Sequence, residues 1–132
     1  MGNLFVLDDD AIFHRLVEFS IHKSRPFKGV YHYYDAQTLI SYVWDNRDDR
    51  SNLPDIILVD LNMPQVDGWQ FLDTLQTISA SLCKTIQVYI VTVSVIKDDR
   101  QKAALYPIVK DFIIKPISTK WLVSLSQSLE KV

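Results

Sequence analysis

Five short apolar runs recur along the chain, separated by segments long enough to hold a helix. They cover residues 4–7, 30–34, 56–59, 86–91 and 109–114. The first, third and fourth are almost continuous in aliphatic and β-branched side chains, which is typical of strands buried on both faces of a parallel sheet. The second and fifth include His32, Lys110 and Asp111, so we expect these two strands to be less buried, at the edges of the sheet.

The segments between these runs place apolar residues three or four positions apart, as amphipathic helices do. The apolar stripes are Ile12/Leu16/Val17/Phe19, Ala36/Leu39/Ile40/Val43, Phe71/Leu72/Leu75/Ile78 and Leu122/Leu125/Leu129. Ser118 or Thr119 is placed to cap the last helix. The segment of residues 97–105 is short and polar, which predicts the weakest helix and the one that moves most readily.

Alternating strands and helices predict an α/β fold with right-handed crossovers. Five strand–helix units account for all 132 residues and leave none for a second domain. We therefore expect one domain over residues 1–132, a doubly wound parallel sheet with the strand order 2-1-3-4-5 and helices on both faces.

Composition and charge exclude several functional classes. Hydrophobic residues make up 48% of the chain and charged residues 23%, as in an ordinary globular protein. The net charge of −2 provides no bulk attraction for nucleic acid or for an anionic membrane. No apolar run approaches the roughly 18–20 residues that cross a bilayer. Cys83 is the single cysteine, which fits a reducing compartment, so we expect a cytoplasmic protein.

Polar side chains follow the predicted strands at the point where each one ends. Asp8 and Asp9 follow the first strand, Asp60 the third, Thr92 the fourth and Lys115 the fifth. In a parallel sheet these carboxyl ends lie on one edge, and ligands bind there where the strand order reverses. With the first and third strands as neighbours, the three aspartates are expected to converge.

Three converging carboxylates repel one another unless a proton or a cation compensates their charge. An all-oxygen site with room for water suits Mg²⁺. A helix cap is the competing interpretation; it suits Asp10, and Asp8 taken alone, but it does not explain Asp60. An aspartate nucleophile with Mg²⁺, the amine of Lys115 and the hydroxyl of Thr92 is the minimum equipment for making an acyl phosphate.

Four motifs together resemble those of response-regulator receiver domains of the CheY-like kind. In chain order they are Val6-Leu7-Asp8-Asp9-Asp10, Val59-Asp60-Leu61-Asn62-Met63-Pro64-Gln65-Val66-Asp67-Gly68, Ile90-Val91-Thr92 and Phe112-Ile113-Ile114-Lys115-Pro116. The D-x-x-M-P-x-x-D-G stretch is highly specific, and the resemblance extends over essentially the whole chain. It implies a flavodoxin-like (βα)5 fold and a role in phosphorelay signalling.

The resemblance also implies a role for each matching residue. Asp60 is the expected phosphoacceptor, and Asp8, Asp9, Asp60 and the backbone carbonyl of Asn62 are the expected ligands of Mg²⁺, for which Mn²⁺ can substitute. Thr92 is expected to hydrogen-bond the phosphoryl group.

Lys115 is expected to pair with the phosphoryl group, and its bond to Pro116 is typically cis in this family. Phe112 matches the aromatic switch position and is expected to turn inward when Thr92 moves toward the phosphoryl group. One departure is Val93, where the family usually has alanine or another small residue beside the phosphorylation site.

The expected partners follow from the resemblance. The phosphoryl donor is a sensor histidine kinase or a histidine phosphotransfer protein. The output is a downstream protein or a second copy of the chain, bound through the fourth helix, fifth strand and fifth helix, with no direct contact to nucleic acid or membrane. The sequence leaves open whether the chain stands alone or is a piece of a larger regulator.

Two other functions compete with the phosphorelay receiver. A Mg²⁺-dependent phosphohydrolase of small molecules needs a general acid or base near Asp60, and none is evident in the sequence. A degenerate receiver acting only as a binding module is disfavoured because the five polar strand-end residues are intact. The histidines His14, His22 and His32 show no metal-ligand spacing, so no catalytic role is assigned to them.

Overall fold

The computed structural model describes residues 2–63, 66–93 and 96–130, and strands alternate with helices throughout. The strands are β1 (Asn3–Leu7), β2 (Gly29–Tyr33), β3 (Ile56–Val59), β4 (Gln87–Thr92) and β5 (Val109–Ile114). The helices are α1 (Ala11–Ile21), α2 (Ala36–Asp45), α3 (Gly68–Ile78), α4 (Lys97–Ala103) and α5 (Thr119–Glu130), with a short 3-10 helix over Ser79–Ser81.

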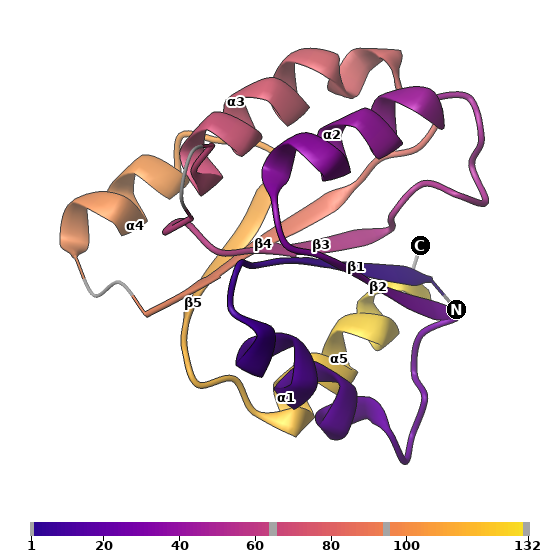
Figure 1. The fold of residues 1–132 in the computed structure, drawn as a ribbon, viewed down its shortest axis with the longest axis vertical. Helices are drawn as coiled ribbons and strands as arrows, with labels where there is room; N and C mark the ends of the chain where they lie inside the picture. The colour runs from indigo at the N-terminus through magenta and orange to yellow at the C-terminus, as the bar shows by residue number, and fades with distance from the viewer. Residues whose placement is uncertain (1, 64–65, 94–95, 131–132) are drawn as a thin grey trace.

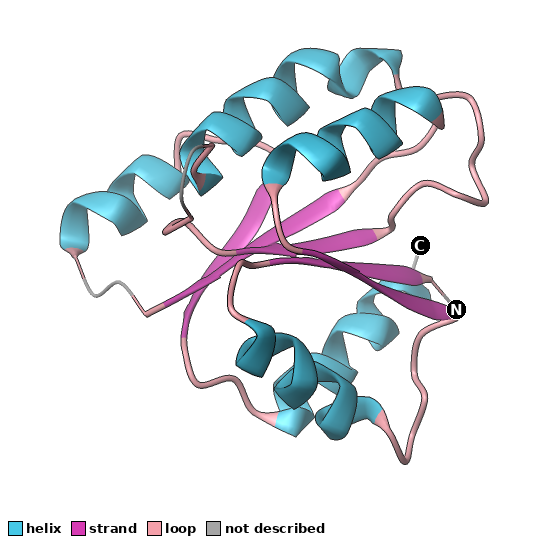
Figure 2. Ribbon diagram, in the orientation of Figure 1, coloured by secondary structure: helices cyan, strands magenta, loops and turns pink. Residues whose placement is uncertain are grey.

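The five strands form one parallel sheet in the order β2-β1-β3-β4-β5, which confirms the predicted topology. Figure 1 shows α1 and α5 on one face of the sheet and α2 and α3 on the other, and Figure 2 shows the sheet as the middle layer. In the central pair, Leu7 lies opposite Val59. The residues that follow each of them therefore leave the sheet side by side, which is how the fold positions the site.

Side chains of the central strands alternate between two hydrophobic cores. Phe5 and Val59 pack in the core beneath α2 and α3, which also takes Ala103 from α4. Val6 and Leu58 pack in the other core with residues of α1 and α5. Every residue of β1 and β3 is buried, so the side chains on both faces of these strands lie in the protein interior, as the continuous apolar runs predicted.

The edge strands and helix caps also agree with the sequence prediction. β2 and β5 lie at the two edges and are only partly buried. The hydroxyl of Ser118 accepts a hydrogen bond from the backbone N–H of Trp121 at 3.0 Å, which caps the start of α5. In the part of the chain that the structure describes, no helix is both long and apolar enough to span a membrane.

The apolar stripe predicted for α1 is wrong in its phase. Ile12, Leu16 and Phe19 are 63%, 52% and 83% exposed. The buried face instead carries Phe13, His14, Val17 and Ile21, so only Val17 of the predicted stripe faces the core. The helix has apolar residues on most of its circumference, and the direction of burial depends on His14. A histidine is stable in a core only when its ring nitrogens have partners, which the sequence alone did not show.

Candidate functional site

Asp8 and Asp60 are held in place by extensions of the sheet hydrogen bonding. The backbone N–H of Asp60 donates to the carbonyl of Leu7 at 3.0 Å, and the N–H of Asp8 donates to the carbonyl of Tyr33 at 3.1 Å. Asp8 is fully buried and Asp60 nearly so, whereas Asp9 is exposed. One carboxylate oxygen from each of the three aspartates lies within 4.8 Å of the other two. The expected convergence of these three side chains is therefore present.

The burial of Asp8 is electrostatically unfavourable despite two strong contacts. Its Oδ2 lies 2.6 Å from Nζ of Lys115, and its Oδ1 accepts a hydrogen bond from the N–H of Asp10 at 2.9 Å. Burial nevertheless raises the pKa of Asp8 above its usual value, with a further upward contribution from the charge of Asp60. A cation placed among these carboxylates would relieve that cost.

The donor set fits Mg²⁺. All three side chains offer oxygen, their ligand atoms are close enough to share one ion, and the exposed Asp9 leaves the site open to water. No nitrogen or sulfur ligand belongs to the group, which disfavours zinc or copper. Asn62, whose carbonyl is the fourth expected ligand, lies in the loop after β3, and its N–H donates to Oδ1 of Asp60 at 3.3 Å.

The ammonium group of Lys115 contacts the acidic cluster. Its Nζ is 3.7 Å from Oδ2 of Asp60 and 4.3 Å from the centre of the Phe13 ring. Its backbone N–H donates to the carbonyl of Thr92 at 2.8 Å, so the ends of β4 and β5 are joined directly beside the site. Thr92 is fully buried, and the bond between Lys115 and Pro116 is cis.

The start of α3 packs against the backbone of Asp60, the predicted phosphoacceptor. The N–H of Gly68 donates to the carbonyl of Leu61 at 3.1 Å. A Cβ on Gly68 would lie 2.5 Å from the carbonyl oxygen of Asp60 and 2.7 Å from Cα of Leu61, so only glycine fits here. Pro64, which belongs to the same motif, lies outside the described residues.

Phe112 and Val93 differ in their environments. Phe112 is 6% exposed, packs in the core beneath α2 and α3, and has the guanidinium of Arg100 5.0 Å from its ring centre. The ring of Phe112 is thus buried in this structure. Val93 is 65% exposed immediately after the buried Thr92.

The sequence interpretation missed a chain of polar side chains that begins at Asp8. Nε2 of His14 lies 2.8 Å from the carbonyl oxygen of Asp8, and Nδ1 of His14 lies 2.6 Å from Nδ1 of His32. Nε2 of His32 lies 2.6 Å from Oε1 of Glu18. Burial lowers the pKa of His14 below its ordinary value. The available signal was the place of His14 between Phe13 and Val17, one turn into a helix that follows the acidic motif.

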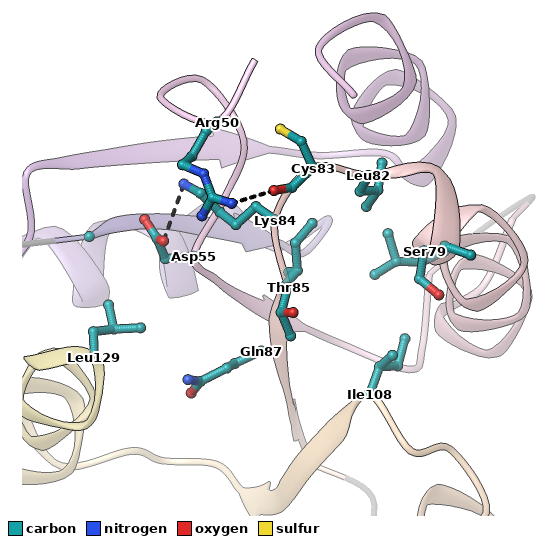
Figure 3. Close-up of a pocket in the computed structure, with 14 residues that line it drawn as sticks. Arg50, Asp55, Ser79, Leu82, Cys83, Lys84, Thr85, Gln87, Ile108 and Leu129 are labelled. Carbon is teal, nitrogen blue, oxygen red and sulfur yellow. Dashed lines mark hydrogen bonds and ion pairs between the residues drawn. The ribbon is translucent and has the colours of Figure 1, made fainter. Parts of the chain in front are cut away.

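A hollow of the surface lies away from this site, at the amino-terminal edge of the sheet. It is a cavity of about 910 Å³. Figure 3 shows that its charged side chains are already engaged: Lys84 pairs with Asp55 at 3.2 Å, and Arg50 donates to the carbonyl of Cys83 at 2.6 Å. The cavity contains none of the predicted site residues.

Comparison with known proteins connects this site to one family. The family model for the response regulator receiver domain matches residues 4–127. No curated protein sequence matches the chain.

Three solved structures illustrate the likeness. A two-component response regulator from Cytophaga hutchinsonii superposes with a TM-score of 0.85 at 21% identity, covering 98% of this chain and 97% of that one. The Mn²⁺-bound form of response regulator Rcp1 gives 0.75 at 23% identity, with 99% and 93% covered. The phosphorylated cyanobacterial phytochrome response regulator RcpA gives 0.71 at 25% identity, with 98% and 91% covered.

Proposed function

The chain belongs to the response regulator receiver domain family, and on this basis we propose that residues 1–132 form a receiver that accepts a phosphoryl group on Asp60 in a Mg²⁺-dependent reaction. The observation that carries the proposal is the acidic cluster itself. Three carboxylates lie within 4.8 Å of one another, and Lys115 lies 2.6 Å from Asp8 and 3.7 Å from Asp60. This is an arrangement built to hold a cation and an anion together.

In the proposed reaction, a carboxylate oxygen of Asp60 attacks the phosphorus of the donor in line with the bond to the leaving group. The new bond joins Asp60 to phosphorus, and the bond from phosphorus to the donor's nitrogen or oxygen breaks, its electron pair leaving with the donor. Asp8, Asp9 and the carbonyl of Asn62 would hold Mg²⁺ beside Asp60. The ion supplies positive charge that offsets the charge of the phosphoryl oxygens.

Lys115 and Thr92 would stabilise the phosphoryl group once it is attached. An ammonium group is a compact charge that can follow an oxygen as it moves, and Lys115 already lies between the two buried aspartates. The hydroxyl of Thr92 comes from the end of β4, on the same edge of the sheet. The solved relatives include one described as Mn²⁺-bound and one described as phosphorylated, which supports both parts of the proposal.

The competing phosphohydrolase would need a general acid or base that reaches Asp60. His14 is the nearest histidine along α1, but both of its ring nitrogens are engaged by Asp8 and His32. Asn62 contacts Asp60 through its backbone N–H and cannot transfer a proton at neutral pH. A stoichiometric receiver is therefore favoured over a turnover enzyme.

The proposed donor is a sensor histidine kinase or a histidine phosphotransfer protein, and the proposed location is cytoplasmic. The proposed output surface is formed by α4, β5 and α5, which would bind a downstream protein or a second copy of the chain. Only Ala103 of α4 is buried among its described residues, so this helix has a small packing cost to overcome when it moves.

Measurement of intact mass after incubation with acetyl phosphate tests the proposal. We expect the protein to gain the mass of one phosphoryl group when Mg²⁺ is present and to gain none when EDTA removes the ion. Asp60→Asn should gain none, whereas Asp48→Asn, in an exposed loop, should behave as the wild type. Equal labelling of Asp60→Asn, or labelling that is unaffected by EDTA, would refute the proposed function.

A further inference from the structure

Asp8 is fixed at four points, and one of these contacts comes from a side chain that does not belong to the motifs that define the site. Its N–H donates to Tyr33, its Oδ1 accepts from Asp10, and its Oδ2 accepts from Lys115. The fourth contact is between its backbone carbonyl and Nε2 of His14, at 2.8 Å. That carbonyl belongs to the peptide plane that joins Asp8 to Asp9, so its orientation sets the direction in which the backbone enters Asp9.

Hydrogen-bond accounting places a hydrogen on Nε2 of His14, because the carbonyl oxygen of Asp8 can only accept. The other ring nitrogen, Nδ1, lies 2.6 Å from Nδ1 of His32, so one of these two nitrogens carries the hydrogen that they share.

The hydrogen bond between His32 and Glu18, at the surface, stabilises this arrangement. Nε2 of His32 lies 2.6 Å from Oε1 of Glu18, whose side chain is 55% exposed. A carboxylate only accepts, so Nε2 of His32 donates to Glu18. The hydrogen bonds thus run from Glu18 on the surface of α1, through His32 of β2 and His14, to the backbone carbonyl of Asp8. Each contact orients the next ring or group.

We propose that His14 is a positioning residue for the metal site: it holds the peptide plane between Asp8 and Asp9 in the orientation that lets both carboxylates face one cation, and His32 and Glu18 hold its ring in place. This inference rests on the proposed Mg²⁺ site. Groups that hydrogen-bond to metal ligands orient them, and replacement of such groups typically costs about 10–100-fold in metal affinity.

A merely structural histidine would have a different signature. It would contribute to the free energy of unfolding through its buried ring, and every replacement that packs equally well would bind Mg²⁺ equally well. The positioning role requires a donor at one particular atom. Glutamine places its amide nitrogen the same number of bonds from Cα as Nε2 of histidine, whereas asparagine places it at the distance of Nδ1. The two variants therefore separate donation to Asp8 from polarity at this position.

The test is the Mg²⁺ dissociation constant, measured by calorimetry on the wild type, His14→Gln and His14→Asn, with urea unfolding in EDTA as the measure of stability. We expect His14→Gln to stay close to the wild type and His14→Asn to bind about tenfold more weakly, after allowance for any difference in unfolding. Equal affinities of the two variants would overturn the inference. A wild type that does not bind Mg²⁺ would instead overturn the proposed function.

A second pair tests the same inference at the less buried residue, should His14→Asn fail to fold. His32→Asn keeps a donor at the position of Nδ1, whereas His32→Leu removes it. We expect His32→Leu to bind Mg²⁺ more weakly than His32→Asn. Equal binding by this pair would show that the ring of His14 needs no partner, and would overturn the proposed chain.

Discussion

The ammonium group of Lys115 lies 2.6 Å from Asp8 but 3.7 Å from Asp60. The lysine that is expected to stabilise the phosphoryl group is therefore paired with a predicted metal ligand before phosphorylation. Mg²⁺ and Lys115 are both attracted to the carboxylate of Asp8, and they repel each other. Binding of the ion and movement of the lysine toward Asp60 are expected to be coupled.

Lys115→Met should bind Mg²⁺ more tightly and accept a phosphoryl group more slowly. The charge of Lys115 repels a cation that binds the same carboxylates, so its removal should raise the affinity for Mg²⁺ by about tenfold or more, equivalent to about 1.4 kcal/mol. Calorimetry and phosphorylation kinetics check the two effects. Lys84→Met is the matched control, because Lys84 is similarly buried but pairs with Asp55 at the opposite edge of the sheet. Unchanged affinity in Lys115→Met would contradict the coupling.

Val93→Ala should be phosphorylated faster by small donors. Val93 directly follows the buried Thr92 and is 65% exposed, and we expect its side chain to form part of the rim of the site. Removing two methyl groups from this rim should widen the approach to Asp60. We expect an increase of up to about tenfold, equivalent to about 1.4 kcal/mol in the barrier.

The rate constant for acetyl phosphate, measured at saturating Mg²⁺, checks this prediction. The same rate in Val93→Ala and wild type would show that the side chain points away from the approach. Ser94, which would flank the same route, lies outside the described residues.

The sheet and the acidic cluster could be predicted because both depend on local patterns. Continuous apolar runs identified β1 and β3, and the polar residues at the strand ends identified Asp8, Asp60 and Lys115. The burial direction of α1 could not be predicted in this way. It depends on His14, whose partner His32 lies on β2, and such a long-range pair leaves no periodic signal in the sequence.

The contacts of α4 also could not be predicted from local patterns in the sequence. This helix was predicted as short and weakly anchored, and it is short. Its Lys102, however, lies 4.5 Å from the ring centre of Trp69 in α3. Tyr106, just after α4, stacks on the same ring and donates a hydrogen bond to Asp73 at 2.6 Å. These polar and aromatic contacts join α4 to α3 where apolar residues are few.

Tyr106→Phe should lower the free energy of unfolding by about 1–2 kcal/mol at neutral pH, because the donor to a carboxylate is lost. Burial, the hydrogen bond to Asp73 and the charge of Asp73 together raise the pKa of Tyr106 from its ordinary value of 10.0 to about 12. The folded state therefore keeps this proton between those two values while the unfolded state loses it. The contribution of Tyr106 is complete below pH 10 and is lost as the pH rises toward about 12.

Urea unfolding of the wild type and Tyr106→Phe across this pH range checks the sign. The difference between the two proteins should shrink above pH 10. A difference that grows with pH would contradict the hydrogen bond to Asp73. Asp73→Asn is the control for the charge, and in it the ionisation of Tyr106, followed by ultraviolet absorbance, should move to lower pH.

Beryllofluoride, as a mimic of the phosphoryl group, should change the amide resonances of α4 and β5 as well as those of the Asp60 pocket. Arg100 lies over the ring of Phe112, so a movement of α4 should be felt by β5 through this pair. Because Phe112 is already buried, we expect the change to appear mainly in α4, over Lys97–Ala103. Changes confined to the pocket, in comparison with Asp60→Asn, would contradict the proposed output surface.

Locating the phosphoryl group on the chain tests the central claim most directly. Borohydride reduction converts an aspartyl phosphate into homoserine, and tandem mass spectrometry of the digested protein then identifies the position. After reaction with acetyl phosphate and Mg²⁺, the account predicts homoserine at position 60 and aspartate retained at positions 8, 9 and 10. Homoserine at any of those three positions with Asp60 unmodified, or no homoserine in a protein that has gained phosphoryl mass, would contradict it.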